Sequence, residues 1–373
     1  MPRLNYDVII IGAGISGSVS AKILAEKGYR VLLVDGVTPP RDKVCSGVQA
    51  GYMGKLIGEK IPEEVLCSNK LKKIRLETPS GRLIEGSMPL LNYWRRDFDY
   101  WLNSLAMDSG AKTRWGAFVK GLSVDNDSAS IVVNNEVIEG KYIIGADGLS
   151  TNSITRKWLF PENFSDLITG ASVNIYFKGL SMVKPDTLYL FYRKEVSDLM
   201  YSWLYYKGKI LVIGTSRTKN LSQYVNTFLE DIKKKFQIHG NEVGRRGYTT
   251  QYKGGVLLGI NRILLVGDAA GLLDLYRGVG MDTAALSGRL CAMSISDALE
   301  GKGSALENYK HRSNRLVSKI KDNNIKQRLR YANDKTIEES FNKWNIIKGL
   351  ILLFKARLWN QFCKPEEIIL IPP

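Results

Sequence analysis

Apolar residues form two short runs near the start of the chain, at residues 7–11 and 30–34, and a helical pattern lies between them. Apolar runs of this length are typical of buried strands. Residues 6–35 therefore predict a strand, a turn, a helix and a second strand, which is one parallel β-α-β unit.

The turn of this unit has the sequence GAGISG. Gly12 permits the tight turn, Gly14 lets backbone N–H groups approach a pyrophosphate, and Gly17 lets the helix and strand pack closely. The helix N-terminus offers unpaired N–H groups and a partial positive charge to the phosphates. Asp35 ends the second apolar run, near the position where an acidic side chain binds a ribose hydroxyl. The unit therefore predicts a bound dinucleotide.

The rest of the pattern predicts a mixed α/β protein with two sheets. Strands are expected within 71–91, 117–134, 142–148 and 262–266, and helices at 96–109, 221–237, 280–299 and 304–331. Residues 171–177, 187–192, 200–206 and 210–215 read as successive strands rich in Tyr, Val and Ile. Such a block predicts an antiparallel sheet inserted into a Rossmann-type domain.

The predicted domains follow from this order. Residues 1–165 and 250–300 form the dinucleotide-binding domain, residues 166–249 the inserted antiparallel-sheet domain that holds the substrate, and residues 301–373 a helical C-terminal region.

The net charge of the chain limits the classes of binding partner to expect. The chain has 53 Lys and Arg against 37 Asp and Glu, a net charge of +16. This surplus suits acidic lipid headgroups or an acidic electron-donor protein. Nucleic acid is not expected, because the sequence has no zinc-finger spacing, RNA-binding aromatic signature or basic repeat.

Cysteine and histidine usage narrows the chemistry. The four cysteines are widely spaced and do not suggest a disulfide scaffold, and the two histidines lie in no motif. We therefore expect no metal site and no Ser-His-Asp hydrolysis, which leaves chemistry carried by a cofactor. The first strand begins without a preceding signal peptide, and no apolar run reaches the ~18 residues of a membrane span, so a cytoplasmic protein is expected.

Four motifs stand in a fixed order: the glycine turn, residues 95–99 (RRDFD), residues 145–148 (GADG), and residues 267–271 (GDAAG) followed by GVG at 278–280. This order resembles the flavoprotein superfamily of p-hydroxybenzoate hydroxylase, over about residues 5–300. The resemblance implies one FAD lying extended across the Rossmann-type domain. No second glycine motif is present, so a separate NAD(P)H site is not expected.

Two further segments narrow the resemblance. Residues 43–47 (KVCSG) resemble the Lys-x-Cys-Gly-Gly segment of geranylgeranyl reductases, and residues 201–207 (YSWLYYK) resemble their Tyr-x-Trp-x-Phe-Pro-Lys strand. Taken with the motifs above, the resemblance implies an FAD site formed by Gly12, Gly14, Ser16, Gly17, Asp35, Cys45, Ser46, Gly47, Arg95, Val119, Asp147, Gly148, Asp268, Gly278, Gly280 and Met281. It implies candidate catalytic residues Cys45, Tyr201 and Tyr206, and candidate substrate-binding residues Tyr201, Trp203, Tyr206, Lys207 and Arg277.

The sequence departs from the family pattern at several places. Leu275 stands where the family usually has Pro, Ser46 where it has Gly, and Tyr206 where it has Pro. In the family the Asp-Gly motif is usually followed by Arg at short spacing. Here the next Arg after Asp147-Gly148 is Arg156, so this spacing does not match the family pattern closely. The aromatic residues of 201–207 also fit an ordinary β-sheet core, and Arg277 also fits a solvated surface charge, with a phosphate headgroup as the other interpretation.

Residues 344–359 place Ile, Leu and Phe on one broad face, with Lys and Asn opposite and Trp at both ends. This pattern fits an interfacial membrane helix, as well as an internal helix of a C-terminal cap. The basic helix before it fits a solvated face. With the net charge, the pattern favours peripheral attachment to the inner face of an anionic membrane.

The predicted function is an FAD-dependent reductase that saturates double bonds of geranylgeranyl chains, in an isoprenoid lipid or a prenyl diphosphate, by hydride transfer from reduced flavin. NAD(P)H and ferredoxin both remain open as the electron donor. Two alternatives remain: a flavin monooxygenase of an aromatic or quinone ring, and a membrane-associated electron-transfer flavoprotein that reduces quinone.

Overall fold

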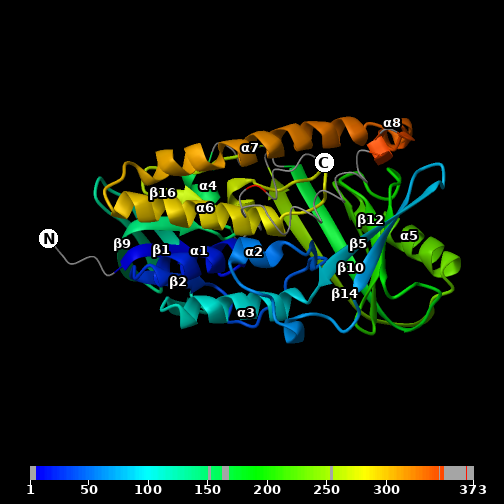
Figure 1. Ribbon diagram of the computed structural model, residues 1–373, viewed down its shortest axis with the longest axis horizontal. Helices are drawn as coiled ribbons and strands as arrows, with labels where there is room; N and C mark the ends of the chain where they lie inside the picture. Colours follow the sequence, from blue (N-terminus) through cyan, green and yellow to red (C-terminus); the bar gives the residue numbers. More distant parts are fainter. Residues whose placement is uncertain are drawn as a thin grey trace.

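Two eight-stranded sheets, joined by a long C-terminal helix, organise the chain (Figure 1). The computed structural model describes residues 6–149, 153–161, 168–252, 255–343 and 345–347, together with Glu367. The first sheet contains β1 (Tyr6–Ile11), β2 (Val31–Asp35), β6 (Lys112–Trp115), β7 (Val119–Val124), β8 (Ala129–Val133), β9 (Glu136–Gly145), β15 (Gly259–Ile260) and β16 (Ile263–Leu265). The second contains β3 (Val48–Ala50), β4 (Leu71–Glu77), β5 (Leu83–Asn92), β10 (Ile168–Leu180), β11 (Thr187–Phe191), β12 (Ser202–Lys207), β13 (Ile210–Arg217) and β14 (His239–Tyr252).

The helices are α1 (Ile15–Glu26), α2 (Met53–Ile57), α3 (Arg95–Asp108), α4 (Thr155–Leu159), α5 (Leu221–Lys235), α6 (Met281–Leu299), α7 (Ala305–Arg330) and α8 (Asp334–Ser340). Two short 3₁₀ turns, Glu63–Val65 and Gly267–Ala270, complete the elements.

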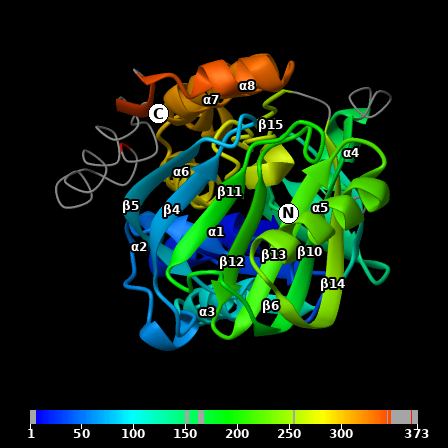
Figure 2. The same cartoon turned by 90° about the vertical axis from the view of Figure 1, so that its right-hand side faces the viewer.

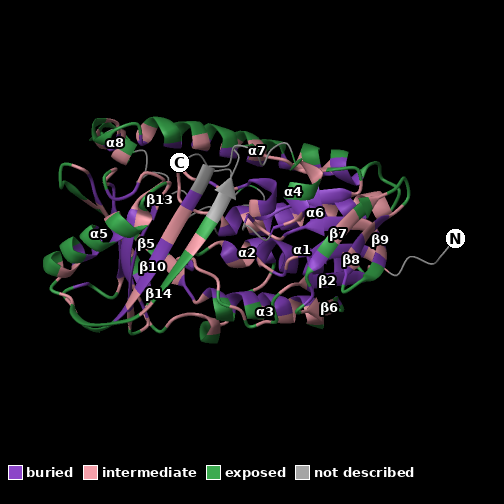
Figure 3. Ribbon diagram, turned by 180° about the vertical axis from the view of Figure 1, so that it is seen from behind, coloured by how far each residue is buried: buried purple, intermediate pink, exposed green. Residues whose placement is uncertain are grey.

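The first sheet has a parallel centre in the order β16-β9-β1-β2-β6. Along each of these strands, apolar side chains point alternately to the two faces of the sheet. Val8 and Ile10 pack under α1, α3 and α6, whereas Ile9 and Ile11 pack against β7 and β8. Both faces are buried, which explains why these strands read as continuous apolar runs (Figure 3).

Two glycines allow the backbone of α1 to pack directly against the glycine turn and against α6. A Cβ atom on Gly17 would lie 1.9 Å from the carbonyl oxygen of Gly12, and one on Gly288 of α6 would lie 2.4 Å from that of Ser16. The Ser20 hydroxyl also donates a hydrogen bond of 3.0 Å to the Gly288 carbonyl. This packing fixes the N-termini of α1 and α6 relative to the first sheet.

The second sheet is antiparallel except where β11 pairs with β4. Figure 2 shows its strands side by side, with α5 on one face. Val225 and Phe228 of α5 pack on that face against β10 and β13. The other face turns toward the first sheet, and the functional side chains lie between them.

The domain boundaries differ from the prediction in one respect. Strands β3, β4 and β5, within residues 48–92, belong to the second sheet and not to the first. They precede β10 by a long stretch of sequence, and pairing across such a distance leaves no local pattern. The second sheet is therefore assembled from two separated segments of the chain.

Helix α7 spans both units (Figure 1). Tyr309 and Leu316 lie in the core of the first sheet, while Tyr331, just after the helix, and Ile337 of α8 pack on the second. Asn333 and Thr336 form a capping box that starts α8. No helix in the described ranges is long and apolar enough to cross a bilayer.

Most predicted elements are confirmed, including the four strands of 168–217 and the helices α3, α5, α6 and α7. Strand β14 was not predicted. The predicted amphipathic helix 344–359 lies outside the described residues except for 345–347.

The close contact at Gly17 predicts a stability effect. Within a helix, Gly→Ala normally stabilises by about 0.5–1 kcal/mol. Because the new Cβ would meet the Gly12 carbonyl oxygen, we expect Gly17→Ala instead to lower the free energy of unfolding by more than about 2 kcal/mol and to weaken binding of the FAD that the resemblance implies. Chemical denaturation and bound-flavin absorbance measure both effects.

Gly244→Ala is the matched control, because its Cβ would meet only the Tyr176 ring at an ordinary 3.8 Å. It should change stability by less than about 0.5 kcal/mol. A Gly17→Ala protein as stable as the Gly244→Ala protein would contradict the packing argument.

Candidate active site

A cavity of about 590 Å³ runs from the glycine turn to the second sheet. Its wall joins segments far apart in sequence: the ends of β1 and β2, residues 41–45, the loop 273–281, and β10, β13 and β14. Of the sixteen residues predicted to bind the cofactor, the cavity wall contains Gly12, Gly14, Ser16, Asp35, Cys45, Arg95, Val119, Asp147, Gly148, Asp268, Gly278, Gly280 and Met281. Gly17, Ser46 and Gly47 lie behind the wall.

The glycine turn presents the N-terminus of α1 to the cavity. Gly14 is the N-cap and supplies no side-chain cap, and the first turn of the helix contains no acidic residue. The first N–H groups of a helix have no partner within it, so this end is suited to a phosphate. Asp35 braces the turn by accepting hydrogen bonds from the N–H groups of Ala13 at 2.7 Å and Val37 at 2.9 Å.

The end of the cavity beside Asp35 has an exposed apolar rim that the sequence did not indicate. Phe118 is 57% exposed and Val37 is 48% exposed, and both line the cavity next to Val119. Gly36 makes room for the ring, because a Cβ atom there would lie 2.4 Å from Phe118. Apolar side chains around an open slot suit a flat base such as adenine.

Arg95 is held by a buried carboxylate. Its Nε and Nη2 atoms donate to Asp99 at 2.7 and 2.8 Å, and both residues lie on α3. Asp99 also lies 3.5 Å from Arg41, whose Nε is 3.8 Å from Asp35. Arg41 and Lys43 were not predicted. With Arg95 they line the cavity, which gives it positive charge for an anionic cofactor.

One oxygen of Asp147 has no hydrogen-bond partner among the described residues, which leave out 150–152. Its Oδ2 accepts hydrogen bonds from the N–H groups of Ile154 and Thr155 at 2.7 and 2.9 Å, but its buried Oδ1 accepts none from the described part of the chain. Burial raises the pKa of this carboxyl in spite of those two bonds. A buried acceptor of this kind calls for a donor from a ligand. Arg156 instead binds the carbonyl groups of Ala269 and Gly255.

The middle of the cavity combines Asp268 with the start of α6. Asp268 lies 3.9 Å from Lys43 Nζ, and Gly280 is the uncapped first residue before α6. Lys43 also lies 5.7 Å from the centre of the Tyr248 ring. Hydroxyl groups could bind Asp268 here, and the helix N-terminus would favour negative charge on a ring edge.

Cys45 faces Met281 across the same region, with 3.8 Å between the two sulfur atoms. Burial acts to raise the pKa of the Cys45 thiol, but Arg95, the Gly47 N–H and Lys43 together outweigh burial and lower it. These neighbours stabilise the thiolate of Cys45 relative to that of an ordinary cysteine.

Ser46 and Gly47 fix the loop that carries Cys45. The Tyr205 hydroxyl donates to the Ser46 carbonyl at 2.8 Å, and the Tyr93 N–H donates to the Gly47 carbonyl at 2.9 Å. Their side of the loop faces β5 and β12 and not the cavity.

Strand β12 turns alternate side chains to opposite faces. Trp203 and Lys207 point toward the first domain: the indole donates to Asn174 at 2.8 Å, and the ammonium donates to the Tyr93 carbonyl. Tyr206 points to the α5 side, where its hydroxyl lies 2.8 Å from that of Ser181. This argues against the predicted catalytic and substrate-binding roles of Tyr206. Trp203 and Lys207 support the Cys45 loop without lining the cavity.

Tyr201 supports the loop that contains Gly278. Its hydroxyl donates to the carbonyl of Arg277 at 3.1 Å, and Gly278 has a φ of +65°. A Cβ atom on Gly278 would lie 2.5 Å from the Tyr201 hydroxyl, so only glycine fits. Tyr201 therefore lies behind this loop and not in the cavity wall.

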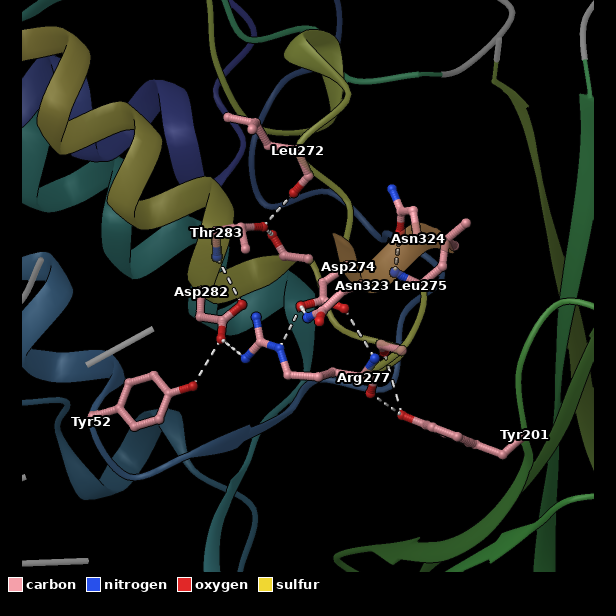
Figure 4. A network of polar contacts seen from close by, with 12 residues as sticks. Tyr52, Tyr201, Leu272, Asp274, Leu275, Arg277, Asp282, Thr283, Asn323 and Asn324 are labelled. Carbon is pink, nitrogen blue, oxygen red and sulfur yellow. Dashed lines mark hydrogen bonds and ion pairs between the residues drawn. The ribbon is translucent and has the colours of Figure 1, made fainter. Parts of the chain in front are cut away.

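Arg277 is not a surface charge. Its guanidinium pairs with Asp274 at 2.6 Å and with Asp282 at 2.9 Å, as Figure 4 shows. This arrangement argues against the predicted contact of Arg277 with substrate.

The cavity fits FAD at several points. The α1 N-terminus suits its pyrophosphate, the Phe118 rim its adenine, and the free oxygen of Asp147 a donor group. A family model described as an FAD binding domain matches residues 5–324. The chain belongs to this family of FAD-binding flavoproteins.

Relatives point to one branch of the family. Digeranylgeranylglycerophospholipid reductase of Methanosarcina acetivorans is 26% identical over 331 residues, covering 81% of this chain and 78% of the relative. A geranylgeranyl bacteriochlorophyll reductase-like protein from Thermoplasma acidophilum has the same fold, with a TM-score of 0.77 at 20% identity, covering 96% of this chain and 100% of that one. A mutant of the halogenase PltM in complex with FAD matches with a TM-score of 0.71 at 17% identity, covering 95% and 80%. This flavoprotein is thus an FAD-dependent oxidoreductase, and it is similar to geranylgeranyl reductases.

The charges around Cys45 predict its reactivity. Because Arg95 lowers the pKa of this thiol, the rate of Cys45 alkylation by iodoacetamide in the flavin-free protein should rise with pH around a midpoint below that of an ordinary cysteine. The substitution Arg95→Met should move this midpoint to higher pH. Mass spectrometry across a pH series measures the rate at Cys45.

Cys67→Ser is the control, because burial raises the pKa of the Cys67 thiol and its removal should leave the profile unchanged. A midpoint for Cys45 at or above that of free cysteine would rule out the electrostatic account.

Proposed function

We propose that this flavoprotein saturates double bonds of geranylgeranyl chains carried by a lipid or a diphosphate. One observation supports this most directly: where the loop 273–281 meets the second sheet, the cavity wall gathers the apolar side chains Leu199, Met200, Leu273 and Leu275. An apolar wall beside the expected flavin ring suits a hydrocarbon chain. The relative named digeranylgeranylglycerophospholipid reductase supports the same substrate class.

The residues around this wall have distinct tasks. Bound FAD, once reduced, supplies the hydride. The start of α6 at Gly280 and the Lys43–Asp268 pair orient the cofactor, and the apolar wall excludes water from the alkene. Cys45 lies beside Met281, where it contacts the cofactor region.

Saturating an alkene also requires a proton, and Tyr248 is the phenol that the described cavity wall offers. It lies on β14, and burial together with the Asp268 carboxylate raises the pKa of Tyr248 to about 12. The phenol therefore keeps its proton at neutral pH. We assign it the proton-supplying role, because the predicted catalytic residues Tyr201 and Tyr206 do not line the cavity.

The function is tested with purified holoenzyme under anaerobic conditions. Dithionite reduces the flavin, so that the result does not depend on the electron donor, and geranylgeranyl diphosphate and a geranylgeranylated glycerophospholipid are offered separately. We expect a mass gain of two hydrogens per double bond in at least one of them. NAD(P)H and reduced ferredoxin are then compared as donors.

Unchanged substrates in both arms would refute the reductase proposal. Oxygen consumption that depends on an aromatic or quinone substrate would indicate a monooxygenase instead, and anaerobic reduction of a quinone headgroup would indicate electron transfer.

Tyr248→Phe tests the proton donor. Loss of a general acid costs about 100-fold or more in rate, so kcat should fall by at least that factor while FAD content stays unchanged. Tyr206→Phe is the matched control, because its hydroxyl lies on the α5 side of the sheet, and it should keep its activity. Equal kcat values for Tyr248→Phe and the unmodified enzyme would exclude this role.

We also propose that the protein works at the cytoplasmic face of an anionic membrane. The outer side of α7 is exposed in Figure 3 and carries Ile325, 58% exposed, and Leu329, 66% exposed. Lys321, Lys326 and Arg328 are exposed around them. An apolar pair within a basic surface suits acidic lipid headgroups, each basic residue contributing about 1 kcal/mol near such a surface.

Sedimentation with vesicles tests this surface. Binding is expected to phosphatidylglycerol vesicles but not to phosphatidylcholine vesicles, and to weaken with salt. Ile325→Glu with Leu329→Glu should remove most of it. Val137→Glu, at a position 57% exposed on β9, is the control and should bind normally. Equal binding by the double variant and the control would contradict the proposal.

A further inference from the structure

A buried ion cluster lies directly behind the loop that faces the expected flavin (Figure 4). Arg277 joins two carboxylates: its Nε lies 2.6 Å from Asp274 and its Nη1 lies 2.9 Å from Asp282. The side chains of both carboxylates are 0% exposed. The proposed reaction uses none of these three groups.

Three residues from the start of α2 and from α7 surround the cluster. Tyr52, just before α2, donates to Asp282 at 2.8 Å, and Asn323 of α7 donates to Asp274 at 2.8 Å. Lys319, also on α7, is close enough that Arg277 acts with burial to lower the pKa of its ammonium to about 8, against the opposite effect of the two carboxylates. The cluster is therefore compact and charged, and its two carboxylates are shielded from bulk water.

The loop itself is short and closed. Asp274 and Val279 exchange two backbone hydrogen bonds of 3.1 Å each, and the Arg277 N–H donates to Asp274 Oδ1 at 3.1 Å. The loop contains no proline, so no ring restricts its backbone. The ion pairs of Arg277 supply the restraint instead, and they leave Gly278 and Gly280 facing the cavity.

Asp282 lies in the first turn of α6. A carboxylate at a helix N-terminus opposes the positive field of that end, and the opposition is strong where water is excluded. The same end faces the cavity at Gly280, where a reduced flavin would carry its negative charge. The guanidinium of Arg277 neutralises the carboxylate at this point.

We propose that Arg277 is a positioning residue that raises the reduction potential of the bound flavin. It does so by compensating Asp274 and Asp282 and by holding the 274–279 loop in place, without touching the substrate. This inference rests on FAD binding alone and not on the identity of the substrate.

A double-mutant cycle of charge-removing substitutions tests the inference, with the FAD-bound enzyme measured in the absence of substrate. The variants are Arg277→Gln, Asp282→Asn and the double variant, and spectroelectrochemical titration gives the midpoint potential of each. Arg277→Gln should lower the potential by at least about 30 mV, which for a two-electron couple is a tenfold loss in stabilisation of the reduced flavin. Asp282→Asn should raise it, and the double variant should return close to the unmodified value.

The midpoint potentials of the three variants distinguish an electrostatic effect of Arg277 from a purely structural one. If Arg277 only braces the loop, the double variant lacks the same brace and its potential stays as low as that of Arg277→Gln, which would overturn the inference. An unchanged potential in Arg277→Gln would also overturn it. If Arg277→Gln does not fold, Asp282→Asn decides alone, since it keeps the shape of the carboxylate and must still raise the potential. FAD content and thermal unfolding are measured for every variant.

Discussion

The backbone contact between α1 and α6 is the constraint on which the site depends. Gly288 lacks the side chain that would hold α6 apart from Ser16 of α1, and Gly17 lacks the one that would hold α1 apart from the turn at Gly12. As a result both helices begin at one cavity, and neither carries a side-chain cap at its first residue. Two partial positive charges therefore face the same elongated space, one suited to phosphates and the other to the ring that accepts electrons.

The sequence predicted the parts of the site that are local in the chain. The glycine turn with Asp35, the Asp268 segment and the Gly278–Gly280 pair each lie at the end of an element whose apolar pattern is clear, so their place at the cavity could be inferred. The face of the sheet to which each side chain of β12 points could not be inferred. Tyr205 and Tyr206 are neighbours, and only the pairing of β12 within the sheet decides which of them faces the Cys45 loop.

Other residues were missed for a related reason. Tyr248 lies on β14, an edge strand paired only with β10, whose polar, glycine-rich sequence has no alternating apolar pattern. The role of Arg277 was predicted wrongly, as a substrate contact with a solvated surface charge as the alternative, because the sequence cannot show that Asp274 and Asp282 are both buried beside it. The place of β3 to β5 in the second sheet was missed because they pair locally with one another, and the pairing that joins them to that sheet, β4 with β11, links distant segments of the chain.

The path of α7 has a mechanical consequence. One end of this helix is embedded in the core of the first sheet, and the residues after its other end pack on the second. Between them, Asn324 accepts a hydrogen bond from the Leu275 N–H at 3.2 Å, and Gln327 donates to the Leu199 carbonyl. The helix thus works as a strut that resists hinge bending between the two sheets. The long-chain substrate proposed above would then enter the cavity with the two halves of the protein remaining fixed relative to one another.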